Sequence, residues 1–239
     1  MESENPQFEK DQLRDERGAM DPVAPVFSTG VGIDAETIKQ ISQAKNEPAW
    51  MLEIRLAAYQ TYLDLPMPKF GPDLNGIDLD QIKYFQRATD HIARDWEDVP
   101  NDIKATFERI GVPEAERKYL AGSAAQYESE AIYSNLKKDL ESQGIIFMDT
   151  DSALQKHPDL VRQYFGTLVP ADDNKFAALN TAVWSGGTFL YVPKNVHADI
   201  PIQSYFRINA GRTGQFERTL IIVEEGGSVN YVEGCTAPN

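Results

Sequence analysis

The sequence predicts an α+β protein in which a mainly helical first part leads into a β-solenoid. Three observations predict this class. The hydrophobic period changes from three or four residues to two near Pro170, most of the net charge of −14 lies before that point, and short apolar runs separated by glycines follow it. A chain of 239 residues, 41% of them hydrophobic, is long enough to bury the core of one large domain or two small ones.

The first part carries the signals of amphipathic helices. Asp34 stands where an N-cap would precede one helix, and Pro48 stands at the start of the next. Within that second segment Met51, Leu56 and Tyr59 recur at helical spacing. We therefore expect helices over residues 35–45, 48–63, 100–111 and 129–144, a short strand over 144–149, and two short helical segments separated at Pro158.

Beyond Pro170 the pattern is that of consecutive short strands. We expect two strands in 179–195 around the Gly186–Gly187 turn, and further strands in 199–210, 215–227 and 228–235. Residues 186–192 (GGTFLYV) are similar to residues 226–232 (GGSVNYV). A recurring element of this kind is typical of a β-solenoid, whose coils stack on one another, and a sandwich or a cupin-like barrel is the alternative.

These patterns divide the chain into three parts. Residues 1–30 are polar and punctuated by proline, which predicts a flexible tail in which Val23 to Phe27 is able to dock. Residues 31–167 form the mainly helical region, and residues 168–239 form the first coils of a truncated solenoid. An end coil needs a cap or a further coil over its unpaired edge, so we expect the molecule to continue past Asn239. A short natural C-terminus after a final edge strand is the alternative.

Composition argues against several classes of function. A pI near 4.6 disfavours binding of nucleic acid through a general basic face. No segment approaches the roughly 18 apolar residues of a membrane span, and the first residues are too charged for a secretory signal. One cysteine and three histidines supply neither a disulfide nor a structural zinc site, and no GxxxxGK[ST] loop for ATP is present. We expect a cytoplasmic protein; a plastid stroma would apply to a plant or algal source, although no transit peptide is visible.

Cys235 is the residue with the most distinctive chemistry. It lies in VEGCTAP, between Gly234 and Pro238, where a strand is expected to meet a turn. A buried lone cysteine is a small inert hydrophobe, whereas an exposed one whose pKa is lowered by a nearby cation attacks sulfur or ligates iron as a thiolate. Arg207 and Arg212 are the candidate cations, and ordinary surface charge is the alternative for both.

Three segments together resemble one protein family. The resemblance is carried by SYFRINAGRTGQFERTLIIVEEGGSVNYVEGCTAP, by NTAVWSGGTFLYVPKNVHADIPIQSYFRIN, and by GVPEAERKYLAGSAAQYESEAIYSNLKKDLESQGIIFMDTD. They resemble the SufB/SufD family of the SUF iron–sulfur cluster assembly system, and its SufB scaffold more than its SufD paralogue. The resemblance runs from about Trp50 to Asn239. It implies a helical N-terminal region leading into a right-handed parallel β-helix, in a complex with the SufC ATPase and SufD.

The resemblance also implies roles for single residues. Cys235 corresponds to the cysteine that accepts persulfide sulfur delivered from a cysteine desulfurase by a sulfur-carrier protein. Arg207 and Asn209 correspond to residues that pass sulfur inward, and a guanidinium is suited to stabilise a thiolate or persulfide anion. A full-length member continues for about as long again and contains the cluster site. The resemblance therefore implies no cofactor in this chain and an iron–sulfur cluster in the complete protein.

The expected function is an assembly scaffold with sulfur-transfer chemistry rather than an enzyme that turns over a small substrate. A SufD-like, non-catalytic β-solenoid interaction module with a buried Cys235 is the alternative. A cupin-like metalloenzyme is a third reading, but it would need further ligands clustered near His197, and the sequence shows none there.

Overall fold

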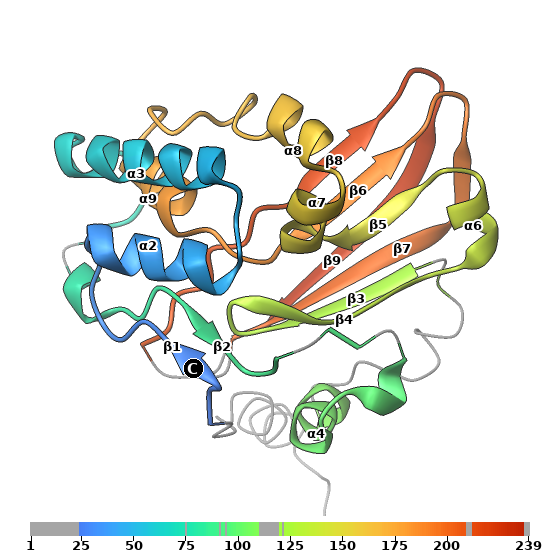
Figure 1. Cartoon of the computed structure of the whole chain (residues 1–239), viewed down its shortest axis with the longest axis horizontal. Coiled ribbons are helices and arrows are strands. Elements are labelled where there is room, and N and C mark those ends of the chain that lie inside the picture. The colour runs from blue at the N-terminus through green and yellow to red at the C-terminus, as the bar shows by residue number, and fades with distance from the viewer. Residues whose placement is uncertain are drawn as a thin grey trace, which may run out of the picture.

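The fold is that of a computed structural model, which describes residues 24–74, 76–90, 92–93, 95–109, 120, 122–208 and 212–236. The helices α2, α3 and α9 gather on one side of the molecule and two open β-sheets lie on the other, with α4 and α6 on the side of the sheets (Figure 1). The helical elements are α2 (Ala35–Ala44), α3 (Ala49–Asp64), η1 (Leu79–Gln81), η2 (Trp96–Asp98), α4 (Asn101–Arg109), α6 (Lys138–Ser142), α7 (Thr150–Lys156), α8 (Pro158–Tyr164) and α9 (Lys175–Val183). The strands are β1 (Phe27–Ser28), β2 (Gln86–Arg87), β3 (Gly122–Tyr127), β4 (Glu130–Leu136), β5 (Ile146–Asp149), β6 (Thr188–Val192), β7 (His197–Arg207), β8 (Leu220–Val223) and β9 (Ser228–Thr236).

The helices α2, α3 and α9 form one layer. Asp34 caps α2 as the sequence predicts, because its carboxylate accepts a hydrogen bond from the Thr37 N–H at 2.7 Å. Pro48 precedes α3, and the Asn174 side chain caps α9. The layer encloses a core of buried apolar side chains, namely Ile38, Ile41, Ala58, Tyr62, Tyr84, Phe85, Ala178, Leu179, Ala182 and Val183.

The two larger sheets have the strand orders β4-β3-β7-β9 and β5-β6-β8. Each starts with an antiparallel pair, β3 with β4 and β5 with β6, and continues with parallel neighbours. In the β7/β9 pair, Phe206 lies opposite Cys235 and Arg207 lies opposite Thr236. The short strands β1 and β2 form a separate antiparallel ribbon.

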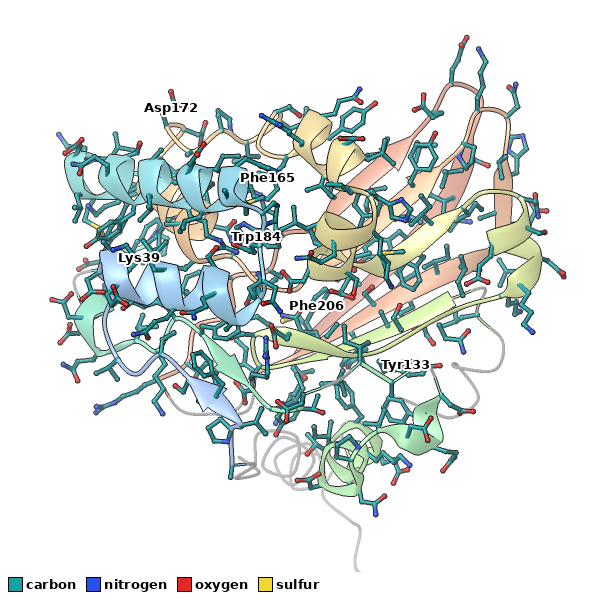
Figure 2. All side chains as sticks on the ribbon, viewed as in Figure 1. Lys39, Tyr133, Phe165, Asp172, Trp184 and Phe206 are labelled. Carbon is teal, nitrogen blue, oxygen red and sulfur yellow. The ribbon has the colours of Figure 1, made fainter. Side chains whose placement is uncertain are left out.

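Apolar cores lie on both faces of these sheets. Figure 2 shows Tyr133, a member of one of these cores, on the side of the four-stranded sheet where α4 lies. Side chains including Phe147, Leu190 and Ile202 fill the space where the two sheets meet. Phe107 of α4 packs on the opposite face of the four-stranded sheet, and Leu154 of α7 packs on the three-stranded sheet. The sheets are thus held between helices and against each other.

The structure corrects the predicted β-solenoid. The α+β class is confirmed, but the right-handed parallel β-helix is wrong: apart from the β1/β2 ribbon, the described strands form two open, mixed sheets, and neither is closed or coiled. The similar segments at 186–192 and 226–232 contain β6 and the first part of β9, which belong to different sheets and do not stack as equivalent coils. Period-two patterning identifies strands, but it specifies neither their partners nor their direction.

Two elements also differ from the prediction. The predicted helix at 129–144 is strand β4 followed by the five-residue helix α6, because Ala131, Ile132 and Tyr133 are all buried and so hide the alternation of a strand. The first predicted strand of 179–195 is instead the end of α9, a helix with few exposed side chains and hence no polar face in its sequence. The later strands are confirmed as β6 to β9.

The turn between α9 and β6 depends on glycine. Gly187 has φ +83°, and a Cβ atom there would lie 2.5 Å from the backbone of Arg218. Of the predicted tail, residues 1–23 lie outside the described residues, whereas β1 pairs with β2 through Phe27 and Ser28.

Candidate functional site

Cys235 lies on strand β9, at the edge of the four-stranded sheet, and its side chain is exposed. Strand alternation places it on the same face as Tyr231 and Glu233. The Tyr231 hydroxyl donates to the Thr188 Oγ1 of β6 at 2.9 Å, so this face looks toward the second sheet. The Cys235 Sγ lies 4.0 Å from Gln215 Oε1. The thiol is therefore accessible at an open end of the space between the sheets.

The electrostatic surroundings of the thiol are acidic. Partial burial raises the pKa of Cys235 above its ordinary value of 9.0, and the nearby carboxylates of Glu217 and Glu233 raise it further. Burial and Glu233 also raise the pKa of Glu217. The sequence led us to expect a cation that lowers the pKa of Cys235, and the structure gives the opposite direction.

Arg207 lies on the strand next to Cys235, as the sequence predicts, but on the other face of the sheet. It is fully buried and stands opposite Tyr127 of β3 and Thr236 of β9. Because Cys235 is in register with Phe206, strand alternation directs the side chains of Arg207 and Cys235 to opposite faces. The backbones of Arg207 and Cys235 are therefore close, but the Arg207 guanidinium and the Cys235 thiol lie on opposite faces of the sheet.

The other two candidate residues do not complete a site around the thiol. Asn209 lies outside the described residues. Arg212 is exposed, has φ 58°, and its carbonyl accepts a hydrogen bond from the Lys83 N–H. His197 lies at the start of β7, where its Nδ1 is 2.7 Å from the Ser228 Oγ. Among the residues that the structure describes, no three His, Cys, Asp or Glu side chains are grouped as metal ligands.

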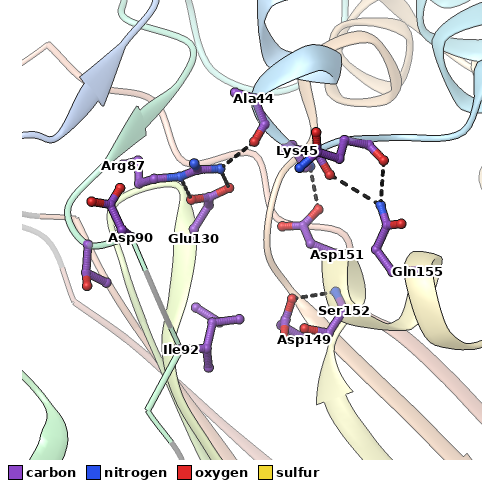
Figure 3. A pocket seen from close by; sticks show the side chains of 13 residues that line it. Ala44, Lys45, Arg87, Asp90, Ile92, Glu130, Asp149, Asp151, Ser152 and Gln155 are labelled. Atoms are coloured by element: carbon purple, nitrogen blue, oxygen red, sulfur yellow. Dashed lines mark hydrogen bonds and ion pairs between the residues drawn. The ribbon is translucent and has the colours of Figure 1, made fainter.

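A polar pocket of about 360 Å³ lies where α2, β2, β4 and α7 meet (Figure 3). Two ion pairs line it: Lys45 Nζ lies 2.5 Å from Asp151 Oδ1, and Arg87 Nε lies 2.5 Å from Glu130 Oε2. Asp149 also lines the pocket, and its carboxylate caps α7 by accepting from the Ser152 N–H at 2.8 Å. Burial, with the charge of Asp151, raises the pKa of Asp149 to about 6.

A buried charge network continues behind this pocket. The fully buried Arg55 donates to both carboxylate oxygens of Glu47, at 2.7 and 2.5 Å, and to the Trp184 carbonyl at 2.8 Å. Burial alone would raise the pKa of Glu47, but Arg55 and Lys45 outweigh it and lower that pKa. Lys45 and Arg55 also lie over the Trp184 ring, 3.9 and 4.8 Å from its centroid. The network joins the helical layer to the sheets.

The sequence reasoning missed these charged groups for identifiable reasons. Glu233 is two residues from Cys235 on one strand, so strand alternation was a signal that could have found it. Glu217 and Gln215 precede β8 and approach Cys235 only through the tertiary fold. The partners Lys45 and Asp151 are separated by about a hundred residues and carry no pairing signal in a single sequence.

None of the described helices has the length and apolar character of a membrane span.

Comparisons with known proteins show which proteins this chain is similar to. Residues 120–204 match the family model described as SufBD protein N-terminal region. The chain is 56% identical over 221 residues to an iron–sulfur cluster assembly SufBD family protein of Staphylococcus epidermidis RP62A, covering 92% of this chain and 48% of that protein.

Similar proteins occur in two further species. The identity is 55% for a protein of the same name in Staphylococcus haemolyticus JCSC1435 and 54% for one in Staphylococcus aureus USA300, with the same coverage of 92% of this chain and 48% of each relative. The chain thus spans about half the length of the curated relatives it matches. Over nearly its whole length, the chain is similar to iron–sulfur cluster assembly SufBD family proteins.

Proposed function

We propose that this chain is part of an iron–sulfur cluster assembly protein of the SufBD family, of the SufB type, and that Cys235 accepts sulfur. The observation that carries this proposal is the 56% identity over 221 residues to a protein named for that process. The exposed thiol of Cys235 supports the SufB type, because sulfur transfer needs a reachable thiol. The iron–sulfur cluster is the product of the assembly. We assign its formation to the part of the full-length protein that this chain does not include.

The proposed chemistry is a thiol–persulfide exchange. The Cys235 thiolate attacks the terminal sulfur of a donor cysteine persulfide. A new S–S bond forms on Cys235, the S–S bond of the donor breaks, and the donor cysteine leaves as a thiolate. The step needs no external oxidant or reductant, because the sulfane sulfur moves with its oxidation state unchanged. A desulfurase and a sulfur-carrier protein are the proposed source of this sulfur.

The acidic surroundings of Cys235 define what the donor must supply. Partial burial, together with Glu217 and Glu233, raises the pKa of the isolated Cys235 thiol, which makes it a poor nucleophile at neutral pH. A donor protein that brings a Lys or Arg side chain against these carboxylates would offset their effect and lower the pKa of Cys235. The proposal therefore includes a donor with a basic docking surface.

Arg207 and Asn209 enter the proposal as positioning residues for onward transfer. Arg207 is a buried cation on the strand beside Cys235, behind the face on which sulfur arrives. The proposed partners in the assembly are a SufC-type ATPase and the SufD paralogue, in the cytoplasm.

Persulfide formation on Cys235 tests the proposal. The chain is incubated with a cysteine desulfurase, its sulfur carrier and cysteine, and the peptide containing Cys235 is analysed by mass spectrometry. We expect an added mass of one sulfur atom, removed by dithiothreitol. Cys235→Ser, which changes one atom, should carry no adduct, and Arg207→Gln should accept sulfur on Cys235 but fail to pass it to a full-length partner. The absence of an adduct in the folded wild-type chain would refute sulfur acceptance.

A non-catalytic interaction module within the same assembly system is the second candidate function. The raised pKa of Cys235 favours it, because a thiol held protonated is chemically quiet. The same experiment separates the two candidates. Failure of both the sulfur donor and iodoacetamide to modify Cys235 would support the module.

A further inference from the structure

A second space, of about 490 Å³, lies between the two sheets at their outer strands. β4 is the edge strand of one sheet and β5 is the edge strand of the other. Residues of these strands line the space together with α6 and α7. The volume is that of a site for a small molecule, which typically occupies a few hundred Å³.

Three lysines give this space its charge. Lys137 and Lys138 stand at the start of α6, and Lys156 ends α7. None of the three forms an ion pair with a residue of the described part of the chain, whereas Lys45 and Lys194 do. Three lysines without such an ion pair thus surround one space, in a chain with a net charge of −14.

Two carboxylates, of Glu141 and Asp149, also line the space. The Asp149 carboxylate accepts a hydrogen bond from the Ser152 N–H at the start of α7, which leaves its negative charge in place, so the lining holds three cations and two anions. The three lysines therefore leave at least one positive charge that the pocket itself does not neutralise. Such a charge favours an anionic ligand.

The opposite wall of the space is apolar and offers a backbone donor. Leu136, Phe147, Met148 and Ile92 contribute to the lining. The Thr150 N–H donates to the Gly187 carbonyl in the β5/β6 ladder, so by antiparallel alternation the N–H of Phe147 points away from β6, toward the β4 side. A ligand here meets cations at the rim, an N–H donor on the edge strand, and an apolar surface.

We propose that the space between β4 and β5 binds a small organic phosphate. Its phosphate group contacts Lys137, Lys138 and Lys156, and its apolar part lies against Leu136 and Phe147, which pack on the same side of β5. A phosphate monoester carries close to two negative charges at neutral pH, which suits several point cations better than the single charge of a carboxylate does. This site is separate from Cys235 and does not depend on the proposed sulfur chemistry.

Phenyl phosphate is the probe, because it joins a phosphate group to an apolar ring. It is titrated into the uniformly ¹⁵N-labelled full chain, and binding is followed by two-dimensional NMR. We expect saturable shifts that include the amide signals of Leu136 and Phe147. The comparison compounds are benzyl alcohol, which keeps the ring without the charge, inorganic phosphate, which keeps the charge without the ring, and phenylacetate, which carries a carboxylate.

Two variants with equal net charge make the test specific. K137Q/K138Q/K156Q removes the three pocket lysines, and K39Q/K69Q/K194Q removes three exposed lysines outside the pocket. The pocket variant should bind phenyl phosphate about tenfold more weakly or worse, since charge-assisted hydrogen bonds are lost, and the control variant should bind as the wild type does. The substituted side chains are exposed, so both variants should retain the circular dichroism spectrum of the wild type.

Four results would overturn the proposal. They are the absence of saturable binding, equal weakening in both variants, binding of benzyl alcohol or inorganic phosphate as tight as that of phenyl phosphate, and equally tight binding of phenylacetate. The first two results would show that the space is not a binding site for phenyl phosphate. The last two would show that its ligand is not an organic phosphate.

Discussion

Asp149 gives the sharpest quantitative prediction of the structure. It ends β5 and caps α7, it is 4% exposed, and its pKa is raised from 3.8 to about 6 by burial and by Asp151. We predict that Asp149→Asn stabilises the protein at neutral pH. The asparagine side-chain oxygen can still accept the hydrogen bond from the Ser152 N–H, so the helix cap is preserved while the buried charge is removed.

The magnitude follows from the two pKa values. In acid well below 3.8 the carboxyl is protonated in both the folded and the unfolded chain, so it affects stability little. As the pH rises toward 6, the unfolded chain ionises more readily than the folded one, and stability is lost. Above pH 6 the full difference, about 3 kcal/mol, opposes folding. The variant should therefore gain about 3 kcal/mol near neutral pH and almost nothing near pH 3.

Urea denaturation, followed by far-ultraviolet circular dichroism across this pH range, measures the effect. Asp34→Asn is the matched control, because Asp34 also caps a helix but is exposed, and hydrogen bonds from Thr37 lower its pKa. Its charge stabilises the fold above its ordinary pKa, so Asp34→Asn should lose stability at neutral pH and match the wild type in acid. A stability difference for Asp149→Asn that did not change with pH would refute the reasoning.

Three further substitutions test other contacts. Glu217→Gln removes a carboxylate that raises the pKa of Cys235, so iodoacetamide should alkylate the thiol faster at neutral pH, and an unchanged rate would rule out this influence. Glu47→Gln leaves the fully buried Arg55 without its carboxylate partner. Urea denaturation should show a free energy of unfolding that is lower by about 3–5 kcal/mol. A loss below about 1 kcal/mol would contradict a buried Arg55–Glu47 ion pair, because exposed pairs contribute no more than that. Gly187→Ala places a Cβ atom 2.5 Å from facing backbone at φ +83° and should lower the thermal midpoint by several degrees, whereas an unchanged midpoint would contradict this close approach.

Local signals made part of the fold predictable. The helix α2 has an N-cap at Asp34 and one apolar face, and both are visible in the sequence. Pro158 marks the boundary of α8 for an equally local reason, because proline suits the first turn of a helix. The strands from β6 onward followed from their alternation and glycine corners.

Tertiary context decided what the sequence did not predict. β4 and α9 are buried too completely for their periodicity to be read, so each was assigned the wrong type. The strand pairing was also unpredictable, because apolar and polar residues alternate in the same way in the strands of a β-solenoid and in those of an open sheet. At the candidate site, exposure of Cys235 fitted its position beside a turn, whereas the carboxylate of Glu217 arrives from a separate segment of the chain.

The burial of Trp184 makes its fluorescence a probe of the contact between the helical layer and the sheets. Its indole is fully buried with two cationic side chains over the ring, whereas Trp50 and Trp96 are half-buried. Loss of the contact between the helical layer and the sheets would bring water to this indole and shift its emission to longer wavelengths. The chain therefore carries an intrinsic optical probe at the joint between its two halves, and replacing the other two tryptophans by phenylalanine would isolate that signal.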